Sequence, residues 1–415
     1  MTRDRARRAP AGIVALLAVI ATLGGCAAQQ GLSMRAEDAK ITSGAEIPVD
    51  VPFAVYVPEV HLDMRFYSAP AGAWITPGDA LRAAITTATE AYFTRSGFIE
   101  VDKPSYDQYG LVATLAPEWD IERGKIILTL GYRVYDAAGE MVTSGEATRS
   151  KPIGSLQDSA GFYNAALKTM QIVIVETINK AFRNDATYEG RIAANDVDKD
   201  LLVNMDDTVR TGTAFFVSES GKLLTAAHVI NGCLRAQIQF EDNSHDVEVV
   251  GSSSLLDVAL LQSEVITDKF LALRAEPKIV LGERVSTAGF PLKNVLAASA
   301  NLTVGNVSSL KALPGSLGKF QFSAPIQPGS SGSPLISEQG ELIGMTTGTL
   351  NVAAMAESGT IPQNVNFALA GEYLEKFNDR YAPDLRRFDE NLSKGDMAGV
   401  NEHLAASVAQ VACYQ

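Results

Sequence analysis

The sequence predicts an α+β domain over residues 47–183, then an all-β domain over residues 201–374 and a helical tail over residues 375–415. Three observations predict this order. The first domain contains a strand, a helix, a run of strands and a second helix. After residue 201, about ten short β runs follow one another with turns between them, which is typical of barrels or a sandwich. Apolar residues at helical spacing return after Gly371.

The composition is that of an ordinary globular protein with an acidic balance. The chain has 415 residues, of which 46% are hydrophobic and 20% are charged, and its formal net charge is −13. This length leaves room for two or three domains of about 100–200 residues each. Because phosphate backbones repel so acidic a chain, we expect no nucleic-acid partner. The sequence predicts no cofactor and no metal site.

The first 46 residues are predicted to be an export signal and a tether. Residues 1–8 are basic and residues 13–22 are apolar, but this segment is too short to span a bilayer as a stable helix. Leu23-Gly24-Gly25-Cys26 resembles the lipobox of bacterial lipoproteins. The resemblance implies cleavage after residue 25, acylation of Cys26 and, because Ala27 follows, an outer-membrane location facing the periplasm. The alternative is a simple secretory signal that contains a cysteine. Residues 26–46 then form a polar tether.

Residues 47–183 contain no catalytic motif. A strand is predicted over 53–57, and Thr76-Pro77-Gly78 opens a helix that ends before Gly97. Strands follow over 98–101, 109–115, 125–136 and 141–150, and a long helix is predicted over 159–182. This arrangement resembles the small α+β domains of envelope lipoproteins, such as transport-auxiliary lipoproteins. The resemblance implies a domain that recruits a partner or substrate.

A charged segment, residues 184–200, is predicted to link the two domains. The strands expected beyond it cover residues 212–217, 222–225, 236–240, 247–250, 258–262, 284–288, 302–307, 320–323, 342–347 and 364–369. Helices are expected over 371–380 and, after Pro383, toward residue 411. Cys233 and Cys413 either pair in an oxidising compartment or remain separate buried thiols, and the sequence leaves both possibilities open.

Three polar residues at strand ends suggest nucleophilic catalysis. His228 follows a strand that ends at Thr225, and Asp257 enters an apolar strand, where a buried carboxylate needs donors such as a histidine N–H. Ser331 lies in a glycine-rich turn, where Gly329 allows dihedrals that direct the N–H groups of Gly329 and Ser331 to one point. Each feature alone has a plain alternative: a buried histidine, a loop aspartate or a serine-rich turn. Together, in one β-rich region, they favour a triad.

Several stretches in this order resemble the trypsin-like serine peptidases, especially the bacterial HtrA/Deg-like branch. They are Gly212-Thr-Ala-Phe-Phe-Val217, Thr225-Ala-Ala-His228, Asp257-Val-Ala-Leu-Leu261, Gly289-Phe-Pro291, the run from Ser323 to Pro334 and Asn364-Val-Asn-Phe-Ala368. The resemblance implies two six-stranded β-barrels with the site between them. It also implies that His228 is the general base, that Asp257 orients it and that Ser331 is the nucleophile, with Gly329 and Ser331 forming the oxyanion hole.

The turn departs from the family pattern, which is usually Gly-Asn-Ser-Gly-Gly or Gly-Asp-Ser-Gly-Gly. Ser330 and Ser333 replace the acidic or amide residue and the second glycine, and Ser333 is expected to crowd the turn. Family spacing places the floor of the substrate pocket at Ser323 and Pro325 and its wall at Thr346, Thr347 and Gly348, which carry no charge. We therefore expect a preference for small or medium apolar side chains.

Three functions agree with these residues. The first is a lipid-anchored periplasmic serine endopeptidase that acts on protein or peptide substrates. The second is a catalytically inactive envelope adaptor that binds proteins or peptides, and the third is an esterase that uses the same triad. The segment after residue 369 is too short and too helical for the PDZ modules of the HtrA branch.

Overall fold

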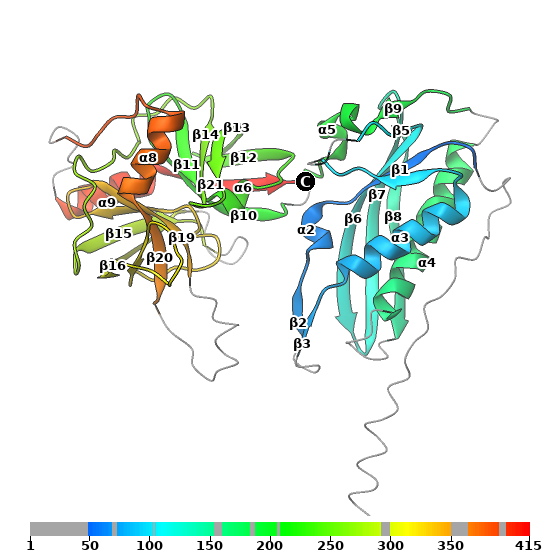
Figure 1. The fold of residues 1–415 in the computed structure, drawn as a ribbon, viewed down its shortest axis with the longest axis horizontal. Coiled ribbons are helices and arrows are strands. Elements are labelled where there is room, and N and C mark those ends of the chain that lie inside the picture. The colour runs from blue at the N-terminus through cyan, green and yellow to red at the C-terminus, as the bar shows by residue number, and fades with distance from the viewer. Residues whose placement is uncertain are drawn as a thin grey trace, which may run out of the picture. The chain divides into compact units, whose positions relative to one another are not determined.

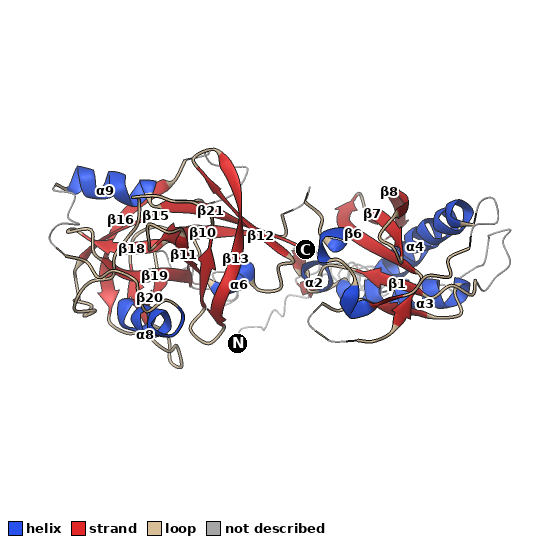
Figure 2. Cartoon of the chain, turned by 90° about the horizontal axis from the view of Figure 1, so that it is seen from above, coloured by secondary structure: helices blue, strands red, loops and turns tan. Residues whose placement is uncertain are grey.

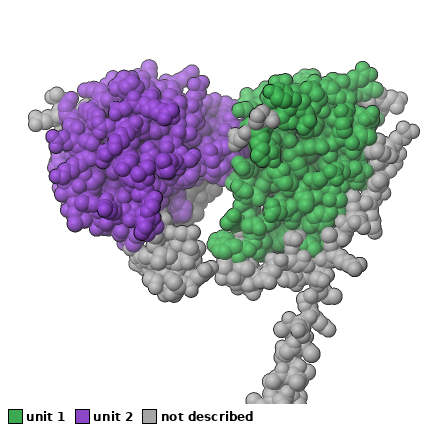
Figure 3. Space-filling view, in the orientation of Figure 1, with its two compact units in different colours: residues 1–201 green, residues 202–415 purple. Residues whose placement is uncertain are grey.

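The computed structural model describes residues 49–68, 73–101, 103, 105–152, 160–182, 187–205, 208–291, 299–349, 364–389 and 396–415. The chain divides into two compact units, residues Met1–Leu201 and Leu202–Gln415 (Figure 3). The predicted signal, the tether and Cys26 lie outside the described residues. Within the described ranges, no helix is both long enough and apolar enough to cross a membrane.

The first unit is a five-stranded sheet with two helices packed on one face (Figures 1 and 2). The strands lie in the order β4 (Ser96–Phe98), β1 (Phe53–Tyr56), β6 (Leu111–Glu122), β7 (Lys125–Asp136) and β8 (Met141–Pro152). β1 runs parallel to β4 and β6, and the other pairs are antiparallel. The helices are α3 (Gly78–Tyr92) and α4 (Ala160–Ala181).

The core of this unit follows from two residue periods. In α3, Leu81, Ile85 and Ala88 are fully buried and lie on one helical stripe. In β7, alternate residues from Ile126 to Val134 are buried, as expected for a strand with one face against helices. The predicted α+β architecture is therefore confirmed. The smaller elements are α2 (Glu59–Leu62), β2 (Phe66–Ser68), β3 (Ala73–Ile75), β5 (Gln108–Tyr109), β9 (Ile192–Ala193), η2 (Ala194–Asp196) and α5 (Lys199–Leu202).

The segment predicted as a linker, residues 184–200, is partly folded against the first unit. Its strand β9 pairs with β5, with Gln108 opposite Ala193 and Tyr109 opposite Ile192. Backbone hydrogen bonding and the burial of Ala193 hold this segment despite its charges. The described part of the linker thus belongs to the first unit, which ends at Leu201.

The second unit consists of two closed six-stranded barrels, as expected from the sequence. Around the first barrel, the strands are β10 (Arg210–Phe216), β11 (Lys222–Thr225), β14 (Val258–Gln262), β13 (Asn243–Ser253), β12 (Arg235–Phe240) and β21 (Val408–Tyr414). Around the second, they are β15 (Arg284–Gly289), β16 (Asn301–Ser309), β17 (Lys319–Phe322), β20 (Asn366–Ala370), β19 (Leu342–Thr349) and β18 (Pro334–Ser337). The helices are α6 (Ala227–Ile230), α8 (Gly371–Tyr381) and α9 (Met397–Ala406).

The predicted helical tail is confirmed over α8 and α9, but the second predicted helix ends earlier than residue 411. Helices α8 and α9 form, but residues 408–414 form strand β21, which closes the first barrel between β10 and β12 (Figure 1). Ala409, Val411 and Cys413 are fully buried in this strand, and the residues between them are half-buried. Pairing on both edges satisfies the backbone groups of three strands at once, which explains why β structure replaces the expected helix.

A disulfide joins β21 to the segment that follows α6. Cys233 and Cys413 are bonded in the structure, with their Cα atoms 5.4 Å apart and 180 residues between them in sequence. Cys413 also pairs with Ala236 in the ladder between β21 and β12. Of the two possibilities that the sequence left open, the structure therefore contains the bonded pair.

Candidate active site

His228 and Asp257 lie together at the edge of the first barrel. His228 is in the short helix α6, directly after β11, and Asp257 directly precedes β14, which pairs with β11. The ring Nδ1 of His228 is 2.9 Å from both carboxylate oxygens of Asp257. Because a carboxylate only accepts hydrogen bonds, Nδ1 carries the proton, and Nε2 of the neutral ring is an acceptor. His228 can therefore accept a proton at Nε2 while Asp257 orients its ring.

Local backbone geometry directs Asp257 toward the histidine. Its φ is +59°, a left-handed conformation that aspartate tolerates better than most residues. The carboxylate also accepts the backbone N–H of His228 at 3.0 Å, so one side chain fixes both the ring and the main chain of that residue. The Asp257 side chain is only 17% exposed, whereas that of His228 is 49% exposed. The ring therefore remains accessible to a substrate.

Ser331 lies in a pair of consecutive tight turns, residues 327–333, which we call the serine turn. The N–H of Ser330 donates to the carbonyl of Gln327 at 2.9 Å, with Gly329 at a φ of +98°. Proline followed by a glycine of positive φ is the signature of a type II turn. The N–H of Ser333 then donates to the carbonyl of Ser330 at 3.0 Å, with Gly332 at a φ of +87°.

The serine turn leaves two backbone donors unused beside the Ser331 side chain. The N–H groups of Ser330, Gly332 and Ser333 all donate to carbonyl oxygens. Among the described residues, the N–H groups of Gly329 and Ser331 have no hydrogen-bond acceptor. Two spare N–H groups at these positions are what stabilisation of an oxyanion requires.

The serine turn of the second barrel packs closely against the first barrel at positions occupied by glycine. A Cβ atom at Gly332 would lie 2.1 Å from the carbonyl oxygen of Thr213, and one at Gly212 would lie 3.1 Å from that of Ser331. The same Cβ at Gly212 would be 2.6 Å from Val229, the neighbour of His228. Ser331 is therefore close to α6. Among the described residues, no hydrogen bond joins Ser331 Oγ to His228; such bonds are often long in the absence of substrate.

The expected crowding at Ser333 is avoided by its neighbour Gly289. Ser333 is 1% exposed, and its φ is not positive, so its backbone does not require glycine. Its hydroxyl would lie 2.1 Å from a Cβ atom on Gly289, so the missing side chain of Gly289 provides the space. Ser330 uses its hydroxyl within the turn, where Oγ accepts a long hydrogen bond from the N–H of Gln327 at 3.4 Å.

The residues predicted to form the substrate pocket differ in their burial and in their hydrogen bonds. Ser323 Oγ accepts the N–H of Asn306 at 3.0 Å, so its hydroxyl is engaged with β16. Thr346 is fully buried and pairs with the serine turn through its backbone, while Gly348 faces open space. Thr347 Oγ1 donates to the carbonyl of Phe367 at 3.4 Å. Pro325 lines a cavity of about 20 Å³ behind the serine turn.

Sequence reasoning did not single out two residues of this region. Asn366, buried at the start of β20, donates through Nδ2 to the carbonyl of Ala324 at 2.7 Å. Thr213, buried in β10, contacts the serine turn directly. Both lie within stretches that matched the family pattern, but their side-chain roles depend on contacts across strands that are distant in sequence.

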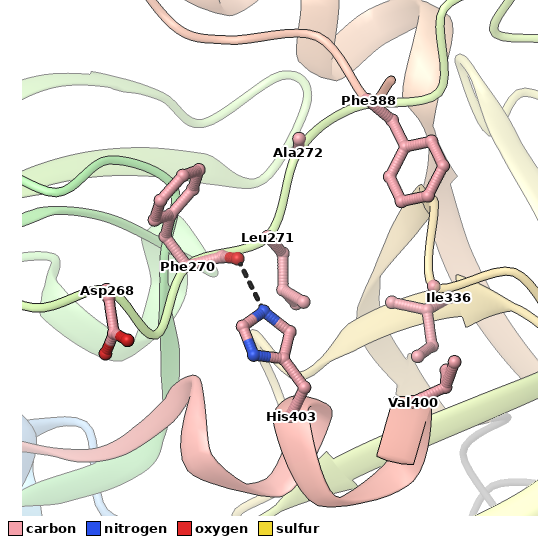
Figure 4. Close-up of a pocket in the computed structure, with 9 residues that line it drawn as sticks. Asp268, Phe270, Leu271, Ala272, Ile336, Phe388, Val400 and His403 are labelled. Carbon is pink, nitrogen blue, oxygen red and sulfur yellow. Dashed lines mark hydrogen bonds between the residues drawn. The ribbon is translucent and has the colours of Figure 1, made fainter. Parts of the chain in front are cut away.

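A second cavity, also of about 20 Å³, lies away from His228 and contains a different histidine. His403 of α9 points its ring toward Phe270, and Nε2 is 2.9 Å from the carbonyl oxygen of that residue (Figure 4). Leu271, Ile336, Phe388 and Val400 contribute apolar side chains to its wall. This contact attaches α9 to the first barrel just before β21 begins, which gives His403 a structural explanation.

Residues 212–345 match the model of the trypsin-like peptidase domain. The chain is similar to uncharacterized protein y4bJ of Sinorhizobium fredii, with 43% identity over 40% of this chain and 26% of that protein. It is also similar to the probable periplasmic serine endoprotease DegP-like of Halomonas elongata, with 29% identity over 39% of this chain and 34% of the relative. The serine protease HTR4 of Rattus norvegicus is 28% identical over 42% of this chain and 35% of its own. The matches thus span about a quarter to a third of these relatives.

Proposed function

We propose that residues 202–415 form a serine endopeptidase that hydrolyses peptide bonds with His228, Asp257 and Ser331. The observation that carries this proposal is the pair of unused N–H groups at Gly329 and Ser331, in the same unit as a histidine oriented by a carboxylate. The match to the trypsin-like peptidase domain and the similarity to serine proteases agree with it.

In this mechanism, Ser331 Oγ attacks the carbonyl carbon of the scissile bond while Nε2 of His228 takes the hydroxyl proton. The negative charge that forms on the carbonyl oxygen is stabilised by the N–H groups of Gly329 and Ser331. His228 then gives the proton to the leaving amine. In the second half of the reaction, a water molecule attacks the acyl-enzyme while His228 takes its proton, and His228 returns that proton to Ser331 Oγ as the acyl group leaves. Asp257 keeps the proton on Nδ1 and stabilises the imidazolium.

We further propose that the enzyme is attached to the bacterial envelope by a lipid on Cys26 and faces the periplasm, because Leu23-Gly24-Gly25-Cys26 resembles a lipobox. The first unit would then hold a partner or a substrate near the membrane. The pocket residues carry no charge, which supports cleavage after small or medium apolar side chains.

An inactive adaptor is the second candidate, because no hydrogen bond joins His228 and Ser331 among the described residues. A fluorophosphonate probe separates the two functions. We expect the full-length protein to be labelled at neutral pH, labelling to vanish in Ser331→Ala and to persist in Ser244→Ala, a matched change on the exposed part of β13. Folded protein that never reacts would exclude the enzyme, and a reaction that survives Ser331→Ala would exclude this nucleophile.

A further inference from the structure

Thr213 connects the two barrels at the serine turn. It lies in β10 of the first barrel, is fully buried and has Gly212 and Ala214 as neighbours. β10 also pairs with β11, which leads into the helix of His228. A residue at this position is therefore attached to the half of the site that carries the base, although its side chain contacts the half that carries the nucleophile.

The threonine contacts the serine turn through both its backbone and its hydroxyl. Its N–H donates to the carbonyl of Ser331 at 2.9 Å. Its Oγ1 donates to the carbonyl of Gly329 at 2.9 Å and accepts the N–H of Phe290 at 3.0 Å. The hydroxyl proton is thereby committed to Gly329, because the N–H of Phe290 occupies the acceptor side of the same oxygen.

These bonds complete the fixation of two peptide groups. The group between Gly329 and Ser330 is held at its N–H by Gln327 and at its carbonyl by Thr213. The group between Ser331 and Gly332 is held at its N–H by Thr346 and at its carbonyl by Thr213. The N–H of Ser331 belongs to the peptide group between these two. Since both flanking groups are fixed at both ends, the direction of that N–H is fixed as well.

We propose that Thr213 is the positioning residue that keeps the serine turn in the conformation with both oxyanion donors free. The expected effect on catalysis rests on the proposed peptidase function. The expected effect on the conformation of the serine turn does not depend on it. The hydroxyl is required rather than the bulk of the side chain. Valine has nearly the same shape, but it leaves the half-buried carbonyl of Gly329 and N–H of Phe290 without this hydroxyl partner. Serine retains the hydroxyl.

The experiment compares Thr213→Val with Thr213→Ser in the full-length protein. Hydrogen exchange measured by mass spectrometry on peptides that cover residues 325–335 reports the turn directly. Labelling by the fluorophosphonate probe and kcat and KM for a peptide substrate report its use. Thr287→Val is the matched control, because Thr287 is a buried strand threonine of the second barrel whose Oγ1 has no partner among the described residues.

We expect Thr213→Val to speed exchange in the serine turn by about tenfold or more, and to lower kcat and the labelling rate roughly 10- to 100-fold with little change in KM. Thr213→Ser and Thr287→Val should both stay within about threefold of the wild type, because the positioning hydroxyl is present in each. A peptide boronic acid, which needs the oxyanion donors, should lose affinity in Thr213→Val in parallel with kcat.

Unchanged exchange in residues 325–335 of folded Thr213→Val would overturn the proposal, whether or not the protein is an enzyme. Equal loss in the serine and valine variants would overturn it too, because bulk rather than the hydroxyl would then matter. If the wild-type protein is unreactive while exchange responds as expected, the peptidase function fails and the positioning role stands.

Discussion

The contact between Gly289 and Ser333 allows a quantitative test of how this chain accommodates a serine in place of the usual second glycine. In Gly289→Ala, the new Cβ atom would lie 2.1 Å from Ser333 Oγ and 2.8 Å from Thr213 Oγ1. The backbone of Gly289 is outside the left-handed region, so crowding alone determines the cost. Overpacking of this kind destabilises a core by about 1–3 kcal/mol. We therefore expect Gly289→Ala to lower the free energy of unfolding by roughly that amount.

The second variant, Ser333→Gly, removes the closer of the two contacts. Alone, it should cost about 1 kcal/mol, because glycine raises the entropy of the unfolded chain. Part of that cost is offset, because the Ser333 hydroxyl is buried without a partner among the described residues. In the double variant, only the 2.8 Å contact with Thr213 remains. The double variant should thus be more stable than the sum of the single effects predicts, by about 1–2 kcal/mol.

Urea unfolding can assign this effect to the second unit. Both tryptophans of the chain, Trp74 and Trp119, lie in the first unit, so their fluorescence follows that unit alone. Far-UV circular dichroism follows both units, and the part of its change that fluorescence does not share reports the barrels. The tryptophan transition should be the same in all variants. Single effects that add to the double effect within about 0.5 kcal/mol would refute the reasoning.

Three further changes have definite expected results. Gly332→Ala places a Cβ atom 2.1 Å from the Thr213 carbonyl oxygen at a φ of +87° and should abolish labelling by the fluorophosphonate probe. The control Gly315→Ala, at a φ of +83° with no atom within 4 Å, should cost only about 1–2 kcal/mol of backbone strain and keep the labelling. Equal labelling of both variants would contradict this prediction. Cys413→Ser opens the loop closed by the disulfide and should destabilise the barrels by up to about 5 kcal/mol in the chain-entropy model, as seen in the circular-dichroism transition; an unshifted midpoint, or two alkylatable thiols in the native protein, would count against it. Cys26→Ser should move the protein from the membrane fraction to the soluble fraction after cell lysis, and persistent tight attachment would argue against acylation.

The architecture was predictable where one residue period dominates a segment. The helical stripe of α3 and the alternation in β7 each allow a single interpretation, and the resemblance around His228, Asp257 and Ser331 supplied the double barrel. The tail was different. Residues 408–411 contain two valines and an alanine, which suit a buried strand as well as a continuation of α9, and only the open edges of β10 and β12 decide between them. No local pattern carries that information.

The same limit applies to the serine turn. From sequence, Ser333 predicts crowding, because a one-dimensional pattern compares each residue only with the family residue at that position. The space for its side chain comes from Gly289, 44 positions earlier in the chain. The hydroxyl of Thr213 likewise finds its partners in the other barrel. Such compensation depends on tertiary contacts and becomes visible only when the two barrels are in place.

Strand β21 also determines when the first barrel can close. The barrel that carries His228 and Asp257 includes residues 408–414, so it cannot close before this segment has been synthesised. Until then, β10 and β12 present open edges, and Thr213 lacks the strand that flanks it on one side. For the proposed peptidase, we expect a chain in which β21 has not yet formed to be inactive. Bonding between Cys233 and Cys413 would then mark the chains in which strand β21 has been made and placed.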